Sequence, residues 1–146
     1  MSYTIQELKI GQSDSFSKTI TETDVYLFAG ITGDLNPAHV DVEYSKNTRF
    51  GKRIAHGMLS AGLISTVLGT KLPGAGTIYL SQQINFLAPV YFGDTITAVI
   101  EVEELMSERN RAILHTYCKN QEGKIVADGK ATVMPPGGQQ GESNYI

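Results

Sequence analysis

The segment from Gly57 to Gly69 constrains the fold more than any other part of the chain. It reads GMLSAGLISTVLG, with three glycines, and it is apolar on nearly every face of a helix. A helix without a polar face is expected to be buried on all sides. At about 1.5 Å of rise per residue it would be roughly 20 Å long, a length that a curved sheet of ordinary strands can wrap. The sequence therefore predicts a long central helix that a sheet surrounds.

The chain after this helix has the pattern of an antiparallel sheet. A loop at residues 72–76 is followed by apolar runs that turn signals separate. We predict four consecutive strands in these runs, near residues 78–86, 95–105, 111–120 and 124–134. Residues 120–123 join the last two as a hairpin, and Pro89 with Gly93 marks the break after the first. The expected fold class is α+β, with the antiparallel sheet wrapped around the helix.

The residues before the central helix add one strand and two helices. Residues 15–20 alternate polar and apolar side chains, which is the period of a half-buried strand. Thr21 can cap a helix that Gly33 ends. A short polar helix with an aspartate cap is predicted at residues 41–46, and the irregular basic stretch at residues 49–53 is interpreted as a surface flap.

Length and composition indicate one domain. The chain has 146 residues, of which 41% are hydrophobic, and this is enough for a sizeable core. We assign the domain to residues 1–134. Residues 135–146 are rich in proline, glycine and glutamine and have nothing to bury, so we expect a flexible tail.

Charge and targeting signals restrict the partners and the location that we expect. A net charge of -3 without blocks of like charge gives no electrostatic reason to expect binding to nucleic acids or anionic membranes. The first residues, MSYTIQE, lack a basic region followed by an apolar run, and no segment approaches the ~20 apolar residues that span a bilayer. A single cysteine, Cys118, cannot form an intrachain disulfide. We therefore expect a cytoplasmic protein.

The chemistry that we expect is concentrated in residues 33–41, GDLNPAHVD, and residues 55–58, AHGM. Asp34 and His39 lie five positions apart across an Asn-Pro turn. In this turn Asn36 is interpreted as the cap of the helical turn that the proline begins and as an orienting amide, with direct contact to the substrate as the less favoured alternative. A carboxylate and an imidazole that converge on one water can act as general acid and base. The two segments therefore predict a site for acid–base catalysis.

Asp34 and His39 each have a structural alternative. Aspartate is a common turn residue, so the Asp34 side chain could simply cap the next turn. An isolated His39 would be interpreted as a partly buried structural histidine. Their occurrence together in the pattern Asp-x-Asn-Pro-x-His favours the catalytic interpretation.

The second histidine of the region, His56, is interpreted as a side chain that holds the loop in front of Gly57. A metal site could also be drawn from four side chains, those of Asp34, His39, Asp41 and His56. None of the usual tight ligand spacings occurs among them. We therefore predict no metal and no cofactor.

Nucleophilic catalysis is not indicated by the sequence. Cys118 lies in an alternating strand without an evident activating partner, which is typical of a small buried or interface residue. Ser60 and Ser65 lie on the central helix without the Gly-x-Ser-x-Gly elbow of serine hydrolases. An acyl-enzyme mechanism is therefore disfavoured.

A family resemblance is carried by three segments, residues 34–39 (DLNPAH), 55–58 (AHGM) and 79–90 (YLSQQINFLAPV). Together they resemble the MaoC-like (R)-specific enoyl-CoA hydratases, and within them the short single-domain type that feeds polyhydroxyalkanoate synthesis. The likeness covers nearly the whole chain, from about Phe16 to Met134. It implies a hot-dog fold, in which a sheet wraps a central helix. It also implies a homodimer or higher homo-oligomer, whose active sites lie near the interface.

The resemblance implies a lyase that adds water reversibly to trans-2-enoyl-CoA and forms (R)-3-hydroxyacyl-CoA. This reaction needs a base for the water, an acid for the α-carbon and donors for the enolate oxygen. We predict that Asp34 and His39 hold one water and share the roles of base and acid. The backbone N–H of Gly57, at the start of the central helix, is expected to meet the enolate oxygen. Ser65 matches a family serine two helical turns further along, which helps to shape the site.

The expected substrate is an acyl chain on coenzyme A, with an acyl-carrier-protein thioester as the alternative. The central helix and the strand near residues 78–90 would line its tunnel. The sequence does not decide the chain length or the physiological direction. Lys52, Arg53 and Lys71 are the best available charges for the nucleotide phosphates, although exposed basic side chains are often only solvated.

Two other functions stay open at this point. A thioesterase on the same fold would hydrolyse the thioester and would also use a carboxylate, although the Asp-x-Asn-Pro-x-His turn favours hydration. A non-catalytic acyl-binding subunit would instead pair with an active homologue, as in some heterodimeric dehydratases that resemble this family. The presence of both Asp34 and His39 argues against a subunit without chemistry.

Overall fold

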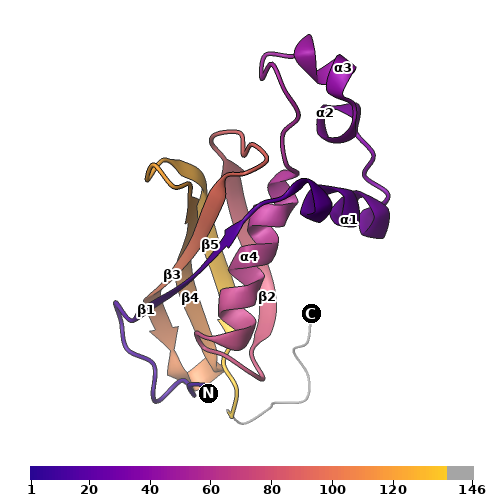
Figure 1. Ribbon diagram of the computed structural model, residues 1–146. Helices are drawn as coiled ribbons and strands as arrows, with labels where there is room; N and C mark the ends of the chain where they lie inside the picture. Colours follow the sequence, from indigo (N-terminus) through magenta and orange to yellow (C-terminus); the bar gives the residue numbers. More distant parts are fainter. Residues whose placement is uncertain (138–146) are drawn as a thin grey trace.

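One sheet and one long helix make up most of the computed structural model, which describes residues 1–137 (Figure 1). The strands are β1 Ser13–Thr19, β2 Ile78–Phe86, β3 Thr95–Met106, β4 Arg111–Lys119 and β5 Ile125–Met134. The helices are α1 Glu22–Thr32, α2 Pro37–Val40, α3 Val42–Lys46 and α4 Gly57–Thr70, with a 3-10 turn at Ser107–Arg109. The strands and helices predicted from the sequence are all present, and their bounds agree to within two residues.

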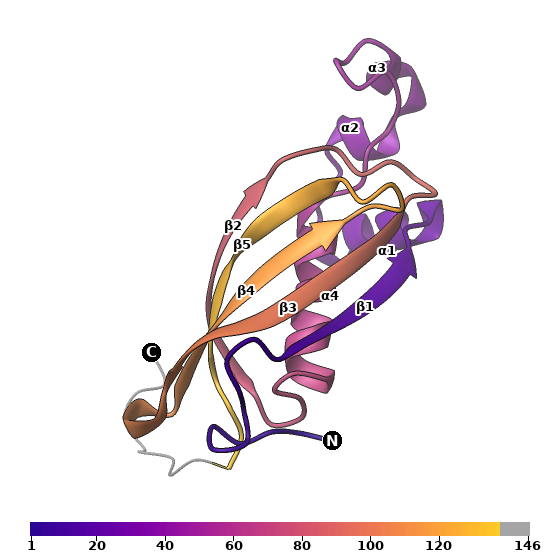
Figure 2. The ribbon, with the colours of Figure 1, turned by 90° about the vertical axis from the view of Figure 1, so that its left-hand side faces the viewer.

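The strands form an antiparallel sheet in the order β1-β3-β4-β5-β2, and α4 packs against one face of it (Figure 2). Side chains along β3 and β4 alternate between buried and partly exposed, as expected when only one face of a sheet is covered. The core between sheet and helix contains the fully buried Ile64, Val67, Leu68, Ile96, Ile100 and Leu114. The predicted α+β class, with a sheet around a central helix, is confirmed.

The prediction that α4 is buried on every side is wrong for the single chain. The sheet covers one side, where the helix buries Leu63, Ile64, Val67 and Leu68. On the other side Met58 is 56% exposed, and Gly62, Ser65 and Gly69 are exposed as well. These four residues recur at intervals of three or four, so they form one stripe along the helix. Composition shows that α4 lacks a strongly polar face, but it does not show how many faces the sheet covers.

Local capping sets the bounds of α1 and therefore the start of the loop that follows it. The Thr21 hydroxyl accepts from the N–H of Asp24 at 3.1 Å, and the Asp24 carboxylate accepts from the N–H of Thr21 at 2.9 Å. Gly33 ends the helix at a φ of 80°, in the left-handed region that favours glycine. After Gly33 the chain forms α2 and α3, which lie beyond the N-terminal end of α4 (Figure 1).

The end of β5 is fixed to the β3–β4 hairpin. The carbonyl of Pro135 accepts a 3.0 Å hydrogen bond from the buried side chain of Asn110. Most of the tail predicted to be flexible, residues 138–146, lies outside the described residues. Within residues 1–137, none of the helices has the length and apolar character needed to cross a membrane.

Candidate active site

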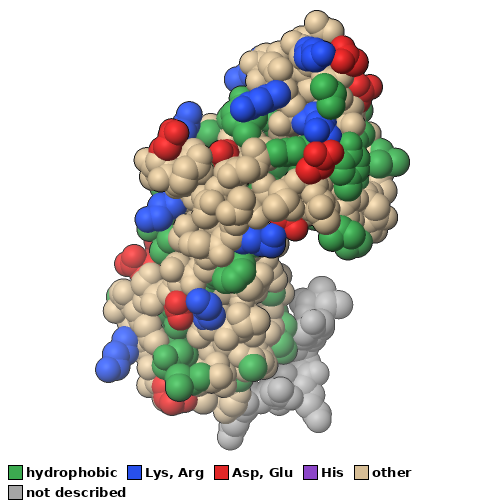
Figure 3. Space-filling model, in the orientation of Figure 1, with side chains coloured by type: hydrophobic (Ala, Val, Ile, Leu, Met, Phe, Trp, Pro, Cys, Tyr) green, Lys and Arg blue, Asp and Glu red, His purple; other side chains and the backbone are tan. Residues whose placement is uncertain are grey.

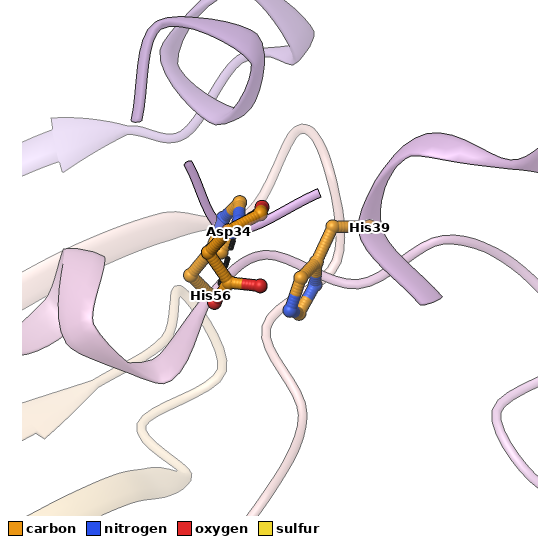
Figure 4. Close-up of side chains that lie close together, drawn as sticks. All are labelled: Asp34, His39 and His56. Atoms are coloured by element: carbon orange, nitrogen blue, oxygen red, sulfur yellow. Dashed lines mark hydrogen bonds and ion pairs between the residues drawn. The ribbon is translucent and has the colours of Figure 1, made fainter. Parts of the chain in front are cut away.

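The loop after α1 and the start of α4 bring Asp34, His39 and His56 together (Figure 4). One carboxylate oxygen or ring nitrogen of each residue lies within 4.8 Å of those of the other two. The histidines are buried, with exposed fractions of 9% and 2%, whereas half of the Asp34 side chain is exposed. The predicted acid–base pair is therefore assembled, and its carboxylate can be reached from solvent.

Hydrogen bonds within the loop hold Asp34. Its N–H donates to the Thr32 hydroxyl at 3.1 Å, and its Oδ1 accepts from the N–H of Asn36 at 3.2 Å. The Asn36 side chain accepts from the N–H of Ala38 at 3.1 Å and so caps α2, as predicted. The second carboxylate oxygen, Oδ2, lies 4.0 Å from Nε2 of His56, which is too long for a hydrogen bond. Oδ2 is thus the oxygen left for a water.

Ile54 fixes both the orientation and the tautomer of His39. The N–H of Ile54 donates to the carbonyl of Ala38 at 3.1 Å, and its own carbonyl lies 2.7 Å from Nδ1 of His39. A carbonyl oxygen can only accept, so Nδ1 carries a proton and Nε2 of the neutral ring keeps its lone pair. His39 therefore has Nε2 available as a proton acceptor.

His56 contacts both members of the pair. Its Nε2 donates to the main-chain carbonyl of Asp34 at 3.0 Å. Its ring lies against that of His39, with 3.8 Å between the ring centroids and 33° between the ring planes. The Phe28 ring also packs against it, with 4.6 Å between the centroids of Phe28 and His56. Its Nδ1 is buried without a partner among the described residues. His56 therefore links the loop that carries Asp34 to the start of α4.

The hydrogen bonds of the two histidines leave few ligand atoms for a metal. Nδ1 of His39 is engaged with the carbonyl of Ile54, and Nε2 of His56 with the carbonyl of Asp34. Nδ1 of His56 is buried. The fourth residue of the hypothetical metal set, Asp41, lies outside this cluster and caps α3, where it accepts from the N–H of Tyr44 at 3.0 Å.

A cavity of about 470 Å³ opens beside His39 and Gly57. Its wall is formed by parts of the flap, the first turn of α4 and the segment at residues 86–90 that follows β2. Most of the lining side chains are apolar, and Arg49 adds a cation. Such a cavity suits an apolar chain attached to a charged carrier.

The first N–H of α4 is free to bind an anionic oxygen at this cavity. Within residues 1–137 the N–H of Gly57 donates no hydrogen bond, and His56, the N-cap of α4, provides no side-chain cap. A methyl group at Gly57 would lie 2.8 Å from ring atoms of Phe86, so glycine lets that ring approach the helix. The free N–H and the positive end of the helix dipole can together stabilise negative charge.

Two of the predicted residues lie away from this cluster. Ser65 belongs to the exposed stripe of α4 and is not among the described residues that line the cavity. Lys71 follows the far end of α4, where its ammonium group donates to the carbonyl of Ser15 at 2.7 Å. In the single chain, neither side chain contributes to the wall beside His39.

The other two predicted cations lie on the flap. Arg53 is already engaged, because its guanidinium donates to Glu22 at 3.2 Å and to the Tyr26 hydroxyl at 2.9 Å. Lys52 is exposed, with its ammonium group 4.4 Å from the ring centroid of Tyr91. Figure 3 shows several Lys and Arg side chains at this end of the molecule.

Sequence reasoning missed Arg49, Phe50 and Val126 as residues of the cavity wall. Arg49 begins the basic stretch already interpreted as a flap, and that position is the signal that could have identified it. Val126 lies on β5, and no local pattern shows that this strand passes the cavity. The tertiary structure brings these residues to the cavity, and no sequence motif marks them.

Cys118 is a core residue, as predicted. It is fully buried, and its Sγ lies 3.6 Å from the carbonyl of Ser60. Burial raises the pKa of the Cys118 thiol to about 12. The thiol is therefore protonated near neutral pH and is not an activated nucleophile.

Comparisons with known proteins agree with the resemblance. The model of the MaoC like domain matches residues 6–123. The (R)-specific enoyl-CoA hydratase of Rhodospirillum rubrum is 53% identical over 131 residues, which cover 90% of each chain. The unliganded R-hydratase PhaJ1 from Pseudomonas aeruginosa has a TM-score of 0.86 and 46% identity, covering 91% of this chain and 85% of that one. The (R)-hydratase of Aeromonas caviae, involved in PHA biosynthesis, has a TM-score of 0.87 and 40% identity. The match covers 90% of this chain and 99% of that one.

The family model spans β1 to β4, the central helix α4, the loop that carries Asp34 and the helix α2 that carries His39. The hot-dog fold implied by the sequence is thereby confirmed. Because the family model spans most of the described residues, the chain belongs to the MaoC-like domain family.

Proposed function

We propose that this chain is an (R)-specific enoyl-CoA hydratase, which adds water to trans-2-enoyl-CoA and, in reverse, dehydrates (R)-3-hydroxyacyl-CoA. The observation that carries the proposal is the meeting of Asp34 with His39, which lines an apolar cavity together with Gly57 and its free N–H. Similar proteins of closely matching length and fold carry the same activity in their names. The acyl-CoA substrate follows from this activity.

Asp34 and His39 activate the water in this proposal. One water between Oδ2 of Asp34 and Nε2 of His39 can donate to both atoms. As its oxygen attacks the β-carbon, Nε2 takes its proton, because Nδ1 is protonated and held by Ile54. The imidazolium then delivers a proton to the α-carbon on the same face, and the Asp34 carboxylate stabilises its positive charge. Syn addition and an (R)-product are the outcome that the family resemblance implies.

Gly57 stabilises the enolate oxygen. As water adds, negative charge moves onto the thioester oxygen, and the free N–H at the start of α4 donates to it. The low polarity of the surrounding wall strengthens this interaction. The N–H of Gly57 binds the neutral thioester oxygen of the substrate more weakly than the charged oxygen of the transition state. It therefore stabilises the transition state more than the bound substrate.

The proposal is tested by mixing the purified chain with crotonyl-CoA and following the loss of enone absorbance. We expect rapid loss, and an (R)-specific dehydrogenase should then oxidise the product. No loss with crotonyl-CoA or with longer enoyl-CoAs would contradict the hydratase. Release of free thiol from a saturated acyl-CoA would favour the thioesterase, and activity that appears only with a partner chain would favour the non-catalytic subunit.

Arg49 is proposed to bind the charged carrier. An Arg49→Ala substitution is expected to raise KM for crotonyl-CoA by about tenfold and leave kcat unchanged, because contacts far from the reacting atoms bind substrate and transition state equally. KM for crotonyl-pantetheine, which lacks the nucleotide, should stay the same. Arg109→Ala, in the turn between β3 and β4, is the matched control. An equal rise in KM with both thioesters would contradict a role at the nucleotide.

The homodimer implied by the resemblance is also a proposal. The exposed stripe of α4, formed by Met58, Gly62, Ser65 and Gly69, supports it. These residues are small or apolar, and a second chain could pack closely against them. Such packing would bury the side of α4 that the sheet leaves open and would place Ser65 at an interface.

A further inference from the structure

We propose that His56 is a positioning residue that aligns Asp34 and His39 with each other and with the N–H of Gly57. Its consequence for catalysis depends on the proposed hydratase function. His56 contacts both members of the pair (Figure 4). Gly57 is the next residue of the chain. His56 is only 2% exposed, whereas half of the Asp34 side chain is exposed and His39 lines the cavity, so His56 is the least accessible of the three side chains to a substrate.

The contact of His56 with Asp34 fixes the main chain and leaves the carboxylate free. Its Nε2 donates to the Asp34 carbonyl at 3.0 Å, whereas Nε2 and Oδ2 are 4.0 Å apart. The Asn36 N–H occupies Oδ1 at 3.2 Å. His56 therefore anchors the loop without competing with water for Oδ2.

The contact of His56 with His39 complements the hydrogen bond from Nδ1 to Ile54. That bond holds one atom of the ring, and because hydrogen bonds tolerate a range of angles, a small rotation about χ1 and χ2 of His39 remains possible. The His56 ring, stacked at 3.8 Å, blocks this rotation by occupying the space beside the His39 face. The hydrogen bond to Ile54 and the packing against His56 together determine where Nε2 of His39 points.

His56 performs this role as a neutral ring. Its Nε2 carries the proton that the Asp34 carbonyl accepts, and its Nδ1 is buried without a partner among the described residues. A second proton would create an unpaired buried donor and would place a charge against His39, which is itself charged during the proposed reaction. The two histidines are thus distinct, because one exchanges protons and the other keeps its tautomer.

Three substitutions separate the two contacts. His56→Gln keeps a donor near the Nε2 position without the ring, His56→Phe keeps a ring without the donor, and His56→Ala removes both. We expect kcat for crotonyl-CoA to fall about 100-fold in the alanine variant, the loss that a misplacement of ~1 Å can cause. The glutamine and phenylalanine variants should each lose about tenfold, and KM should stay within about twofold throughout. His115→Gln, on the outer face of the sheet, should retain the wild-type kcat.

A spectroscopic readout tests the arrangement independently of turnover. The chain has three histidines, so two-bond ¹H–¹⁵N spectra can assign each tautomer. We expect a proton on Nδ1 of His39 and on Nε2 of His56. The His39 signals should be retained in the phenylalanine variant, which keeps the ring, and should broaden or shift in the glutamine and alanine variants, which lose it.

The outcomes are distinguishable. An inactive wild-type chain would overturn the hydratase proposal, while the spectra would still test the position of His39. Unchanged His39 signals in the alanine variant would overturn the role of His56. A rise in KM at constant kcat in the His56 variants would also overturn this role. The same conclusion would follow if the three variants lost kcat equally and in parallel with a loss of thermal stability.

Discussion

An Asp34→Asn variant is expected to lose about 10³-fold in kcat for crotonyl-CoA while keeping its melting temperature. The amide cannot carry the negative charge that holds the water and stabilises the imidazolium of His39. Its carbonyl oxygen can still accept from the N–H of Asn36, as Oδ1 does at 3.2 Å, so the loop is preserved. Steady-state kinetics together with calorimetry separate the chemical effect from a loss of folding.

The chain offers a matched control for this substitution. Asp41 lies seven residues further along and caps α3, and asparagine caps a helix about as well as aspartate. Asp41→Asn should therefore keep the wild-type kcat. Because Asp34 and His39 are proposed to act on one water, combining Asp34→Asn with His39→Gln should cost little more in kcat than either substitution alone. Additive losses, or a loss below tenfold for Asp34→Asn, would argue against a shared water.

A Gly129→Ala substitution is expected to lower the free energy of unfolding by about 3 kcal/mol. The added Cβ would lie 1.8 Å from the carbonyl oxygen of Gln83 and 2.9 Å from Cα of Ile84. Both are backbone atoms of β2, so they cannot rotate away as a side chain could. Gly129 pairs with Ile84 in the sheet, and β2 must separate from β5 to accommodate the methyl group. Urea unfolding monitored by circular dichroism measures the effect.

The site should respond as well, because β2 leads directly into the cavity wall at residues 86–90. Gly30→Ala is the matched control. Its Cβ would meet no atom within 4 Å, and alanine in a helix is favoured over glycine by about 0.5–1 kcal/mol. Equal stability of the Gly129→Ala and wild-type chains would show that the sheet can relax at this position.

The parts of this fold that sequence reasoning predicts well are those with local causes. Thr21 and Gly33 bound α1 because a capping hydroxyl and a left-handed glycine act within a few residues of the chain. The same holds for the Asn36 cap and for the alternation of buried residues in β4. Asp34 and His39 could be paired in advance because one short turn connects them.

The parts that could not be predicted depend on distant or main-chain partners. Arg53 looks free in the sequence, but it donates to Glu22, which lies 31 positions away. The tautomer of His39 depends on a carbonyl oxygen, which every residue has and no sequence pattern distinguishes. The open side of α4 depends on where the sheet ends, and side-chain composition does not determine that boundary.

The two hydrogen bonds between Ile54 and α2, one donated and one accepted by Ile54, make this position a natural choice for engineering substrate range. Both bonds use its main chain, so the reactive imidazole stays in place whichever side chain is present. Ile54 also lines the cavity beside His39. A library at this position, excluding proline because it has no N–H, can therefore reshape the cavity while keeping the contacts of the proposed base.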